Sequence, residues 1–324
     1  MKTIDEIRDL IGKAFDEQEQ SFEPRELYEP IAYTLKNGGK RLRPILVMLG
    51  CQAFTDELNE AIMPAVGIEM FHNFTLLHDD IMDKAFIRRN QPTVHIKWDV
   101  NRAILSGDAL AIKANVFIAS VRREVLPEVL GVFNKTALQV CEGQQYDLNF
   151  EMRNEVSEEE YLTMISLKTA VLLAGSLKIG ALIGGATTKQ ADLLYSFGHD
   201  MGLAFQLQDD YLDTFGTVEN FGKSIGGDIK ANKKTILLIK ALIQADEKDK
   251  KKLDKLFSTK KGNQDKKVEE VIAIFKKLNI DTYIRKLVID YSHKALETLE
   301  EIDVDAVRKD ELVKFTNQLI NRVS

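Results

Sequence analysis

The apolar residues of this chain recur at spacings of three and four along most of its length instead of alternating with polar ones. Residues 236–243 (ILLIKALI) and 161–167 (YLTMISL) illustrate this spacing. It places apolar side chains on one face of a helix, whereas a half-buried strand alternates. All six prolines lie at or before Pro127, so the C-terminal part of the chain lacks the residue that most often interrupts a helix. The pattern predicts an all-α fold.

Glycine pairs predict breaks between helices at Gly38-Gly39, Gly184-Gly185 and Gly226-Gly227. Residues 248–267 are polar and rich in lysine, which indicates a solvated surface helix and loop. The sequence has no long linker and no tandem repeat of fixed period, so we expect a single domain over residues 1–324.

The most apolar stretch, Thr169 to Thr188, is long enough to suggest a membrane span. Lys178 lies at its centre and glycines divide it, which favours a buried helix or helix pair. Residues 1–16 mix charged and apolar residues as an amphipathic helix does, without the apolar run of a signal peptide. We therefore expect a cytoplasmic protein.

The net charge of −6 argues against binding to nucleic acid or to an anionic membrane. An anionic ligand would need local Lys and Arg side chains or bound cations. The two cysteines, Cys51 and Cys141, have neither disulfide nor zinc-site spacing, and we expect both to be small core residues.

The strongest chemical signal is an Asp-Asp-x-x-Asp pattern that occurs twice. The two copies are Asp79, Asp80 and Asp83, and Asp209, Asp210 and Asp213. On a helix the first and last carboxylates of each copy lie on one face, about one turn or roughly 5.4 Å apart. Apolar neighbours hold both copies in the protein although the carboxylates repel each other, so a bound cation is expected.

Carboxylate oxygens without a thiol or imidazole cluster suit a hard cation. Mg²⁺ typically takes one or two carboxylates together with water and substrate phosphate oxygens. A calcium loop of the EF-hand type is excluded because Lys84, Ala85 and Phe86 follow Asp83 where alternating ligands and a glycine are needed. Two solvated acidic helix faces remain the alternative.

Cations cluster in residues 38–44 (GGKRLRP) and at Arg88-Arg89. Guanidinium groups bind phosphate through paired hydrogen bonds, and glycine lets backbone amides approach an anion. The clusters predict a diphosphate ligand, although any one of these cations could instead cap a helix end. The sequence lacks the Gly-x-x-x-x-Gly-Lys-Ser/Thr pattern of a nucleotide-binding P-loop.

At this point the chain resembles the trans-type polyprenyl synthetases, a family that includes farnesyl and geranylgeranyl diphosphate synthases. The resemblance runs from about Tyr33 to Thr235 and weakens toward the C-terminus. Besides both acidic motifs it rests on residues 38–44, Arg88-Arg89, Gly107-Asp108, Lys168-Thr169, Phe205-Gln206, and Gly226 to Ile229 with Lys233. It implies the isoprenoid synthase fold, a bundle of antiparallel helices around a deep central cavity, and a homodimer.

The family's roles transfer onto matching positions of this sequence. The resemblance implies a cluster of three Mg²⁺ ions bound by Asp79, Asp83 and Asp209 and supported by Asp80, Asp210 and Asp213. It implies an allylic diphosphate site of Arg88, Lys168, Lys223 and Lys233, and an isopentenyl diphosphate site of Gly39, Lys40, Arg41, His72 and Arg89. His72 lies two helical turns before Asp79 and therefore on the same face, whatever the family.

The implied reaction ionises the allylic diphosphate and joins the resulting carbocation to isopentenyl diphosphate. Thr169, Gln206 and the Lys168 carbonyl resemble the groups that stabilise the cation, and the released diphosphate resembles the base. Phe74 lies five residues before Asp79, about 7.5 Å along the helix. With the small Thr75 it resembles the floor that limits product length, although Phe74 could also be a plain core residue. We expect mainly the twenty-carbon geranylgeranyl product, with the farnesyl product as alternative.

Three other functions remain open. A terpene cyclase shares the fold, but its second acidic motif usually takes an Asn/Ser/Glu form, unlike residues 209–213. A catalytically silent regulatory subunit would lose motif residues, and both motifs are intact here. A metal-binding structural bundle is the third.

Overall fold

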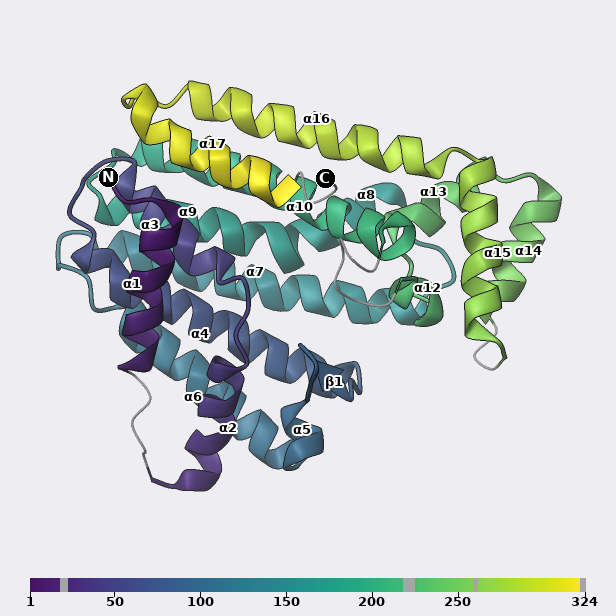
Figure 1. Ribbon diagram of the computed structural model, residues 1–324, viewed down its shortest axis with the longest axis horizontal. Coiled ribbons are helices and arrows are strands. Elements are labelled where there is room, and N and C mark those ends of the chain that lie inside the picture. Colours follow the sequence, from purple (N-terminus) through teal and green to yellow (C-terminus); the bar gives the residue numbers. More distant parts are fainter. Residues whose placement is uncertain (18–22, 218–224, 259–261, 321–324) are drawn as a thin grey trace. The chain divides into compact units, whose positions relative to one another are not determined.

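The computed structural model describes residues 1–17, 23–217, 225–258 and 262–320. Its helices follow one another along the chain with one short hairpin between them (Figure 1). The elements are α1 (Ile4–Asp16), α2 (Arg25–Lys36), α3 (Leu42–Gln52), α4 (Asn59–Met82), β1 (Ile87–Arg88), β2 (Gln91–Pro92), α5 (Val94–Lys97), α6 (Val100–Ile118), α7 (Leu126–Met152), α8 (Glu158–Ile165), the π-helix η1 (Ser166–Ala170), α9 (Val171–Ile183), α10 (Thr188–Phe215), α12 (Gly227–Lys230), α13 (Ile236–Gln244), α14 (Glu247–Ser258), α15 (Gln264–Lys277), α16 (Ile280–Glu300) and α17 (Ala306–Ile320).

Capping side chains mark the N-termini of several of these helices. Thr3 and Glu6 form a capping box at the start of α1, and Ser157 and Glu160 form another at α8. The side chain of Asp99 accepts a hydrogen bond from the Arg102 amide at the start of α6. These side chains satisfy amide groups that the first turn of a helix leaves without partners, so each helix begins at a defined residue.

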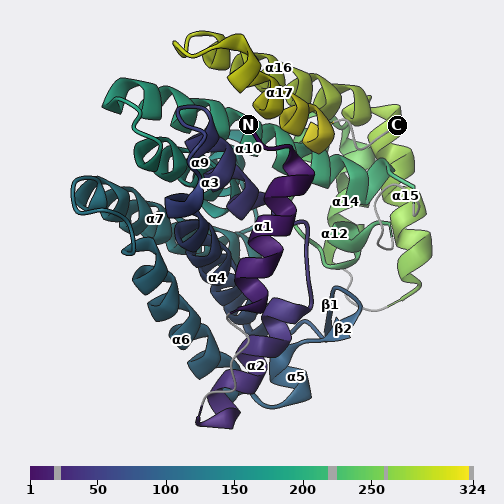
Figure 2. The same ribbon diagram turned by 60° about the vertical axis from the view of Figure 1, so that its left-hand side comes forward.

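The first of two structural units comprises residues 1–137, 175–195 and 302–312. Within it α4 packs along α6, and α1 lies beside α3 and α4, as Figures 1 and 2 show. Helix α3 approaches the second half of α9 so closely that a Cβ on Gly180 would lie 2.0 Å from the Val47 carbonyl oxygen. Glycine at this position therefore serves close helix packing.

The second unit comprises residues 138–174, 196–301 and 313–324. Here α13 packs against α8, α15 and α16, and α15 also contacts α12 and α14. The core of this unit includes Leu207, Ile236, Val271 and Ile284, which are fully buried.

The all-α fold is confirmed. The apolar stretch lies in η1 and α9, within the one described helical segment (Glu158–Ile183) long and apolar enough to cross a membrane; 78% of its most apolar window is buried in protein, as in a core helix. Gly184 and Gly185 divide this stretch as expected, because α9 ends at Ile183 and α10 begins at Thr188, but α9 runs unbroken through Gly175 and Gly180.

Three other details differ from the sequence predictions. The hairpin β1–β2 was not expected, because strands of two residues show no periodicity. Cys51 is buried as predicted. The prediction that Cys141 is a core residue was wrong, because Cys141 is exposed and lies one turn after the exposed Leu138 on α7. Lys267, at the end of the predicted solvated segment, is only 6% exposed and donates a hydrogen bond to Asn232.

Candidate active site

The first acidic motif forms the C-terminal end of α4. The amide of Asp83 donates to the Asp79 carbonyl at 2.8 Å, so these two residues stand one turn apart. Asp80 is more buried than both, and Nε and Nη2 of Arg88 each lie 2.8 Å from its Oδ1. Burial raises the pKa of Asp80, while the charge of Arg88 opposes this rise. Asp79 and Asp83 are the more exposed carboxylates of the motif.

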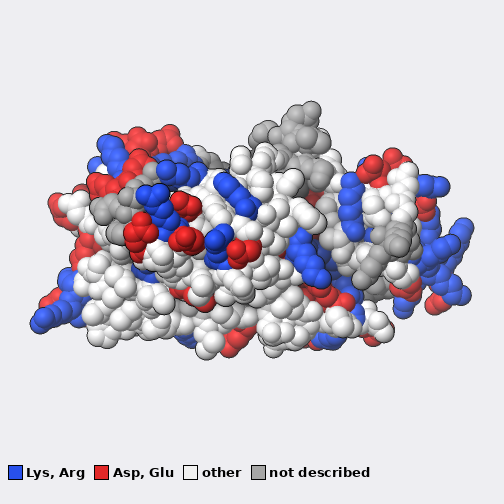
Figure 3. All heavy atoms as spheres, turned by 90° about the horizontal axis from the view of Figure 1, so that it is seen from below, with Lys and Arg blue, Asp and Glu red and all other residues white. Residues whose placement is uncertain are grey.

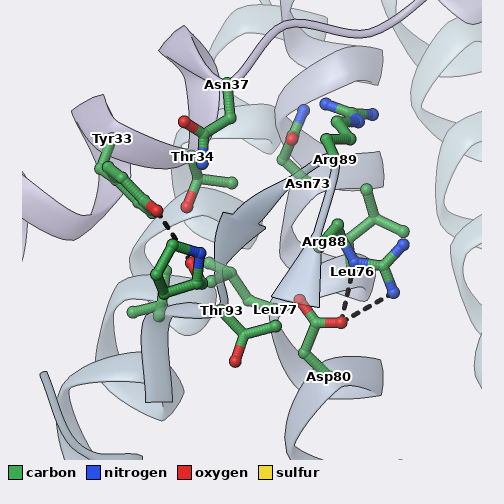
Figure 4. Close-up of a pocket in the computed structure, with 12 residues that line it drawn as sticks. Tyr33, Thr34, Asn37, Asn73, Leu76, Leu77, Asp80, Arg88, Arg89 and Thr93 are labelled. Atoms are coloured by element: carbon green, nitrogen blue, oxygen red, sulfur yellow. Dashed lines mark hydrogen bonds and ion pairs between the residues drawn. The ribbon is translucent and has the colours of Figure 1, made fainter. Parts of the chain in front are cut away.

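The β1–β2 hairpin holds the two arginines that follow the motif. Its turn residues, Arg89 and Asn90, both have positive φ, of 51° and 61°. The hydroxyl of Tyr33 donates to the Pro92 carbonyl at 2.8 Å and ties the hairpin to α2. Figure 4 shows Arg88 reaching Asp80 while side chains of α2 and α4 line the space beside the hairpin. That space holds about 20 Å³, enough for one water molecule.

The glycine-rich basic segment meets the same hairpin. A Cβ on Gly39 would lie 2.7 Å from Arg89 Nη2, so the guanidinium group rests directly on the glycine. Arg41 has a left-handed backbone at the start of α3, and its guanidinium stacks over the Phe15 ring at 4.5 Å. Gly39, Arg41 and Arg89, predicted together from sequence, are thus held by neighbouring elements of the first unit.

The half-buried His72 and the buried Glu69, both on α4, lie close to these cations. Burial, followed by the charges of Arg43 and Arg89, holds the pKa of His72 well below its ordinary value, so the imidazole is neutral near pH 7. Glu69 lies one turn earlier; burial raises its pKa and the same arginines lower it. Sequence reasoning missed Glu69, although its spacing of three residues from His72 placed it on the same helix face.

The second acidic motif lies near the end of α10. Asp210 is 3% exposed and uses both oxygens: the Tyr161 hydroxyl donates to Oδ2 at 2.5 Å, and Gln206 Nε2 donates to Oδ1 at 3.1 Å. Asp213 accepts from the amides of Gly227 and Asp228 at 3.2 and 3.0 Å. Asp209 is the more exposed carboxylate of this motif.

Crowding of carboxylates changes their acidity. Burial and then the charge of Asp228 raise the pKa of Asp213 to about 6, and the same two causes raise that of Asp210. The Nζ atom of Lys233 lies 3.8 Å from Asp228 Oδ1, so its positive charge offsets part of the negative charge of these carboxylates. A divalent cation would relieve the remaining repulsion, so the donor set fits a hard metal ion.

The π-helix η1 carries Lys168 and Thr169. The amide of Val171 donates to the Ser166 carbonyl, five residues earlier, which defines the widened turn. Lys168 Nζ lies 2.5 Å from Asp147 on α7, and Thr169 Oγ1 donates to Gln206 Oε1 at 3.0 Å. Sequence reasoning missed Tyr161 and Asp147 because their partners are far away in the chain.

Among the described residues, no three acidic, histidine or cysteine side chains gather into a metal site by themselves. Lys223 lies outside the described residues. Lys40 and Lys233 are solvent-accessible, and Phe74 is partly buried, with its ring centroid 5.5 Å from that of Phe71.

A family model described as polyprenyl synthetase matches residues 24–275 of this chain. The chain belongs to the polyprenyl synthetase family. It is an enzyme of the trans-isoprenyl diphosphate synthase type, as the motifs predicted, and this family of prenyltransferases depends on Mg²⁺.

Polyprenyl synthetases from archaea are among its relatives. The chain is 38% identical to a geranylgeranyl diphosphate synthase of Methanosarcina mazei, over 99% of this chain and 98% of that one. It is 37% identical to a short chain isoprenyl diphosphate synthase of Methanothermobacter thermautotrophicus, over 95% of each. A crystal structure of a geranylgeranyl pyrophosphate synthase superposes with a TM-score of 0.95 at 41% identity, covering both chains completely.

Proposed function

We propose that this polyprenyl synthetase makes geranylgeranyl diphosphate by adding isopentenyl diphosphate to allylic diphosphates. The observation that carries the proposal is similarity over the whole chain to geranylgeranyl diphosphate synthases, with both acidic motifs intact. Farnesyl diphosphate as main product and a silent regulatory subunit are the alternatives.

Burial supports different roles for the six aspartates. Asp80, Asp210 and Asp213 are buried and engaged by protein donors, which suits support of their neighbours. Asp79, Asp83 and Asp209 are the more accessible carboxylates and would hold Mg²⁺, three ions in all. When bound, Mg²⁺ neutralises charge on the departing diphosphate.

The remaining charged groups serve the two substrates. Arg88, Lys168 and Lys233 would bind the allylic diphosphate, as would Lys223. The oxygens of Thr169, Gln206 and the Lys168 backbone would stabilise the carbocation, since electron-rich groups placed in advance lower the energy of developing positive charge. Gly39, Lys40, Arg41, His72 and Arg89 would bind isopentenyl diphosphate.

The purified protein tests this proposal directly. With Mg²⁺, isopentenyl diphosphate and farnesyl diphosphate, it should release diphosphate and yield geranylgeraniol after dephosphorylation. Farnesol as the main product from dimethylallyl diphosphate would favour the shorter chain. No condensation with any allylic starter would favour a silent subunit.

Arg89→Ala should raise the apparent KM for isopentenyl diphosphate much more than that for the allylic substrate. A lost guanidinium–phosphate contact costs about 1.5–3 kcal/mol, or roughly 10- to 150-fold. Steady-state kinetics with each substrate varied in turn measure both constants. Equal weakening of the two substrates would show that Arg89 does not belong to the isopentenyl site, and Arg25→Ala, at an exposed position on α2, is the control.

Phe74→Ala should lengthen the product at little cost to total condensation, because a bulky ring that stops chain growth is removed. Chromatography of the dephosphorylated alcohols measures the distribution. If Phe74 is only a core residue, the same change should instead lower stability by about 3–5 kcal/mol and leave chain length unchanged. Phe71→Ala, whose buried ring lies beside Phe74, provides that comparison.

We also propose a cytoplasmic homodimer. Leu105, Ile112 and Val116 form an exposed apolar stripe along α6, each more than half exposed. Figure 3 shows a broad area of one face with few charged side chains. Exposed apolar stripes of this kind favour a protein partner, and a purely monomeric species in sedimentation at micromolar concentration would contradict the dimer.

A further inference from the structure

A directed chain of hydrogen bonds links α8 to the π-helix through α10. The Tyr161 hydroxyl donates to Asp210, Gln206 donates to the other oxygen of Asp210, and Thr169 donates to the amide oxygen of Gln206. The three distances are 2.5, 3.1 and 3.0 Å. All four residues belong to the second structural unit.

The donor and the acceptor of each hydrogen bond in this chain determine which group is left for the next hydrogen bond. The NH₂ group of Gln206 faces Asp210 and its carbonyl oxygen faces Thr169, and an amide oxygen can only accept a hydrogen bond. The Thr169 hydroxyl has one hydrogen, and it is used on this oxygen. The other side of Thr169 Oγ1 therefore carries only lone pairs, which attract positive charge.

We propose that Tyr161 is a positioning residue for the condensation: through Asp210 and Gln206 it keeps the Thr169 hydroxyl turned so that only its oxygen lone pairs face the allylic cation. This inference rests on the proposed function. Tyr161 acts at a distance and touches neither substrate nor metal.

The phenol donates to Asp210 Oδ2, and both residues are buried, at 4% and 3% exposure. Without it, the carboxylate would turn to bring Oδ2 toward the remaining donor, because a buried acceptor without a partner costs roughly 1–3 kcal/mol. Gln206 would then lose its fixed orientation. Thr169 could point its hydrogen toward the cation, which repels positive charge.

Tyr161→Phe tests the inference, since it removes one oxygen and keeps the buried ring. We expect kcat to fall about tenfold, as for loss of one well-placed polar contact, while both KM values change less than about twofold. Tyr211→Phe is the matched control. Tyr211 is equally buried in the same unit, but its hydroxyl accepts a hydrogen bond from Arg285 and does not belong to the hydrogen-bond chain that reaches Thr169. Its turnover should stay near that of the wild type.

The binding of two substrate analogues distinguishes the positioning role of Tyr161 from a purely structural role. An ammonium analogue of the allylic cation, offered with inorganic diphosphate and Mg²⁺, should bind about tenfold more weakly to Tyr161→Phe. An allylic thiolodiphosphate, whose carbon stays uncharged, should bind equally to both proteins. In a background of Thr169→Val the further change Tyr161→Phe should have almost no effect, because it acts through the missing hydroxyl.

Additive effects in that double-mutant cycle, equal weakening of both analogues, or an increased Mg²⁺ requirement without loss of ammonium binding would each overturn the inference. If Tyr161→Phe does not fold, Asp210→Asn replaces it: the new amide would donate to Gln206, reverse its orientation and weaken the ammonium analogue more than the thiolodiphosphate, whose binding measures any effect on the metal site. Wild-type protein without condensation would refute the proposed function, whereas an active wild type with an unaffected Tyr161→Phe would refute only the role of Tyr161.

Discussion

Asp209→Ala is expected to reduce turnover by at least about a thousandfold while the protein stays folded, and Asp79→Ala is expected to do the same. Each change removes a solvent-accessible carboxylate, whereas Asp80, Asp210 and Asp213 are buried and accept hydrogen bonds from protein donors. Loss of metal-ion stabilisation costs several kcal/mol of the barrier, and each 1.4 kcal/mol is a factor of ten. Diphosphate release at saturating Mg²⁺ measures the effect.

Stability should respond in the opposite direction. Removing one of several like charges relieves repulsion, so the thermal midpoint without Mg²⁺ should stay constant or rise. Asp265→Ala, at a carboxylate 83% exposed on α15, is the control and should keep full turnover. Near-normal turnover of Asp209→Ala with Mg²⁺ as the only metal would refute the metal assignment.

Gly143→Ala is expected to lower kcat about a hundredfold, because small displacements of catalytic groups are costly. A Cβ on Gly143 would lie 2.3 Å from the Lys168 amide nitrogen and 2.7 Å from the Leu167 carbonyl carbon. Both are backbone atoms of η1, so the π-helix must move with Lys168 and Thr169. Overpacking should also destabilise the protein by about 1–3 kcal/mol.

The same helix offers a control for this change. Gly131 also lies on α7, but a Cβ there would meet nothing within 4 Å. Gly131→Ala should therefore leave kcat unchanged and raise stability slightly through better helix propensity. If both alanine variants kept normal kcat and thermal midpoints, the contact between α7 and η1 would not hold the catalytic residues in place.

The sequence predicted what depends on local pattern. The helices follow from apolar spacing, and both acidic motifs are recognisable because their carboxylates recur at fixed intervals. The spacing could not tell Asp209 from Asp210, since that difference depends on Tyr161, which lies 49 positions away in the chain. Asp147 beside Lys168 was missed for the same reason.

Other misses come from signals too weak to detect. The β1–β2 hairpin depends on positive φ angles at Arg89 and Asn90. Turns with positive φ favour glycine and asparagine, so an arginine in the sequence does not predict one. Cys141 was placed in the core because cysteine usually is, but the face that a helix residue occupies is decided by tertiary packing. The π-helix has an ordinary sequence, SLKTA, with nothing that distinguishes it from α-helix.

The π-helix η1 makes the segment that carries Lys168 and Thr169 more sensitive to a change in its length than to a substitution. The wide turn holds one residue more than a regular turn, so deleting any one residue of 166–170 would restore a regular turn and leave the faces of α8 and α9 in register. The residues inside the turn would change place, and Thr169 would leave Gln206. An inserted residue that the turn does not absorb would instead rotate the α9 surface that meets α3 away from it by about 100°. Across evolution, this segment should therefore accept substitutions such as Leu167→Met while single-residue insertions and deletions are eliminated.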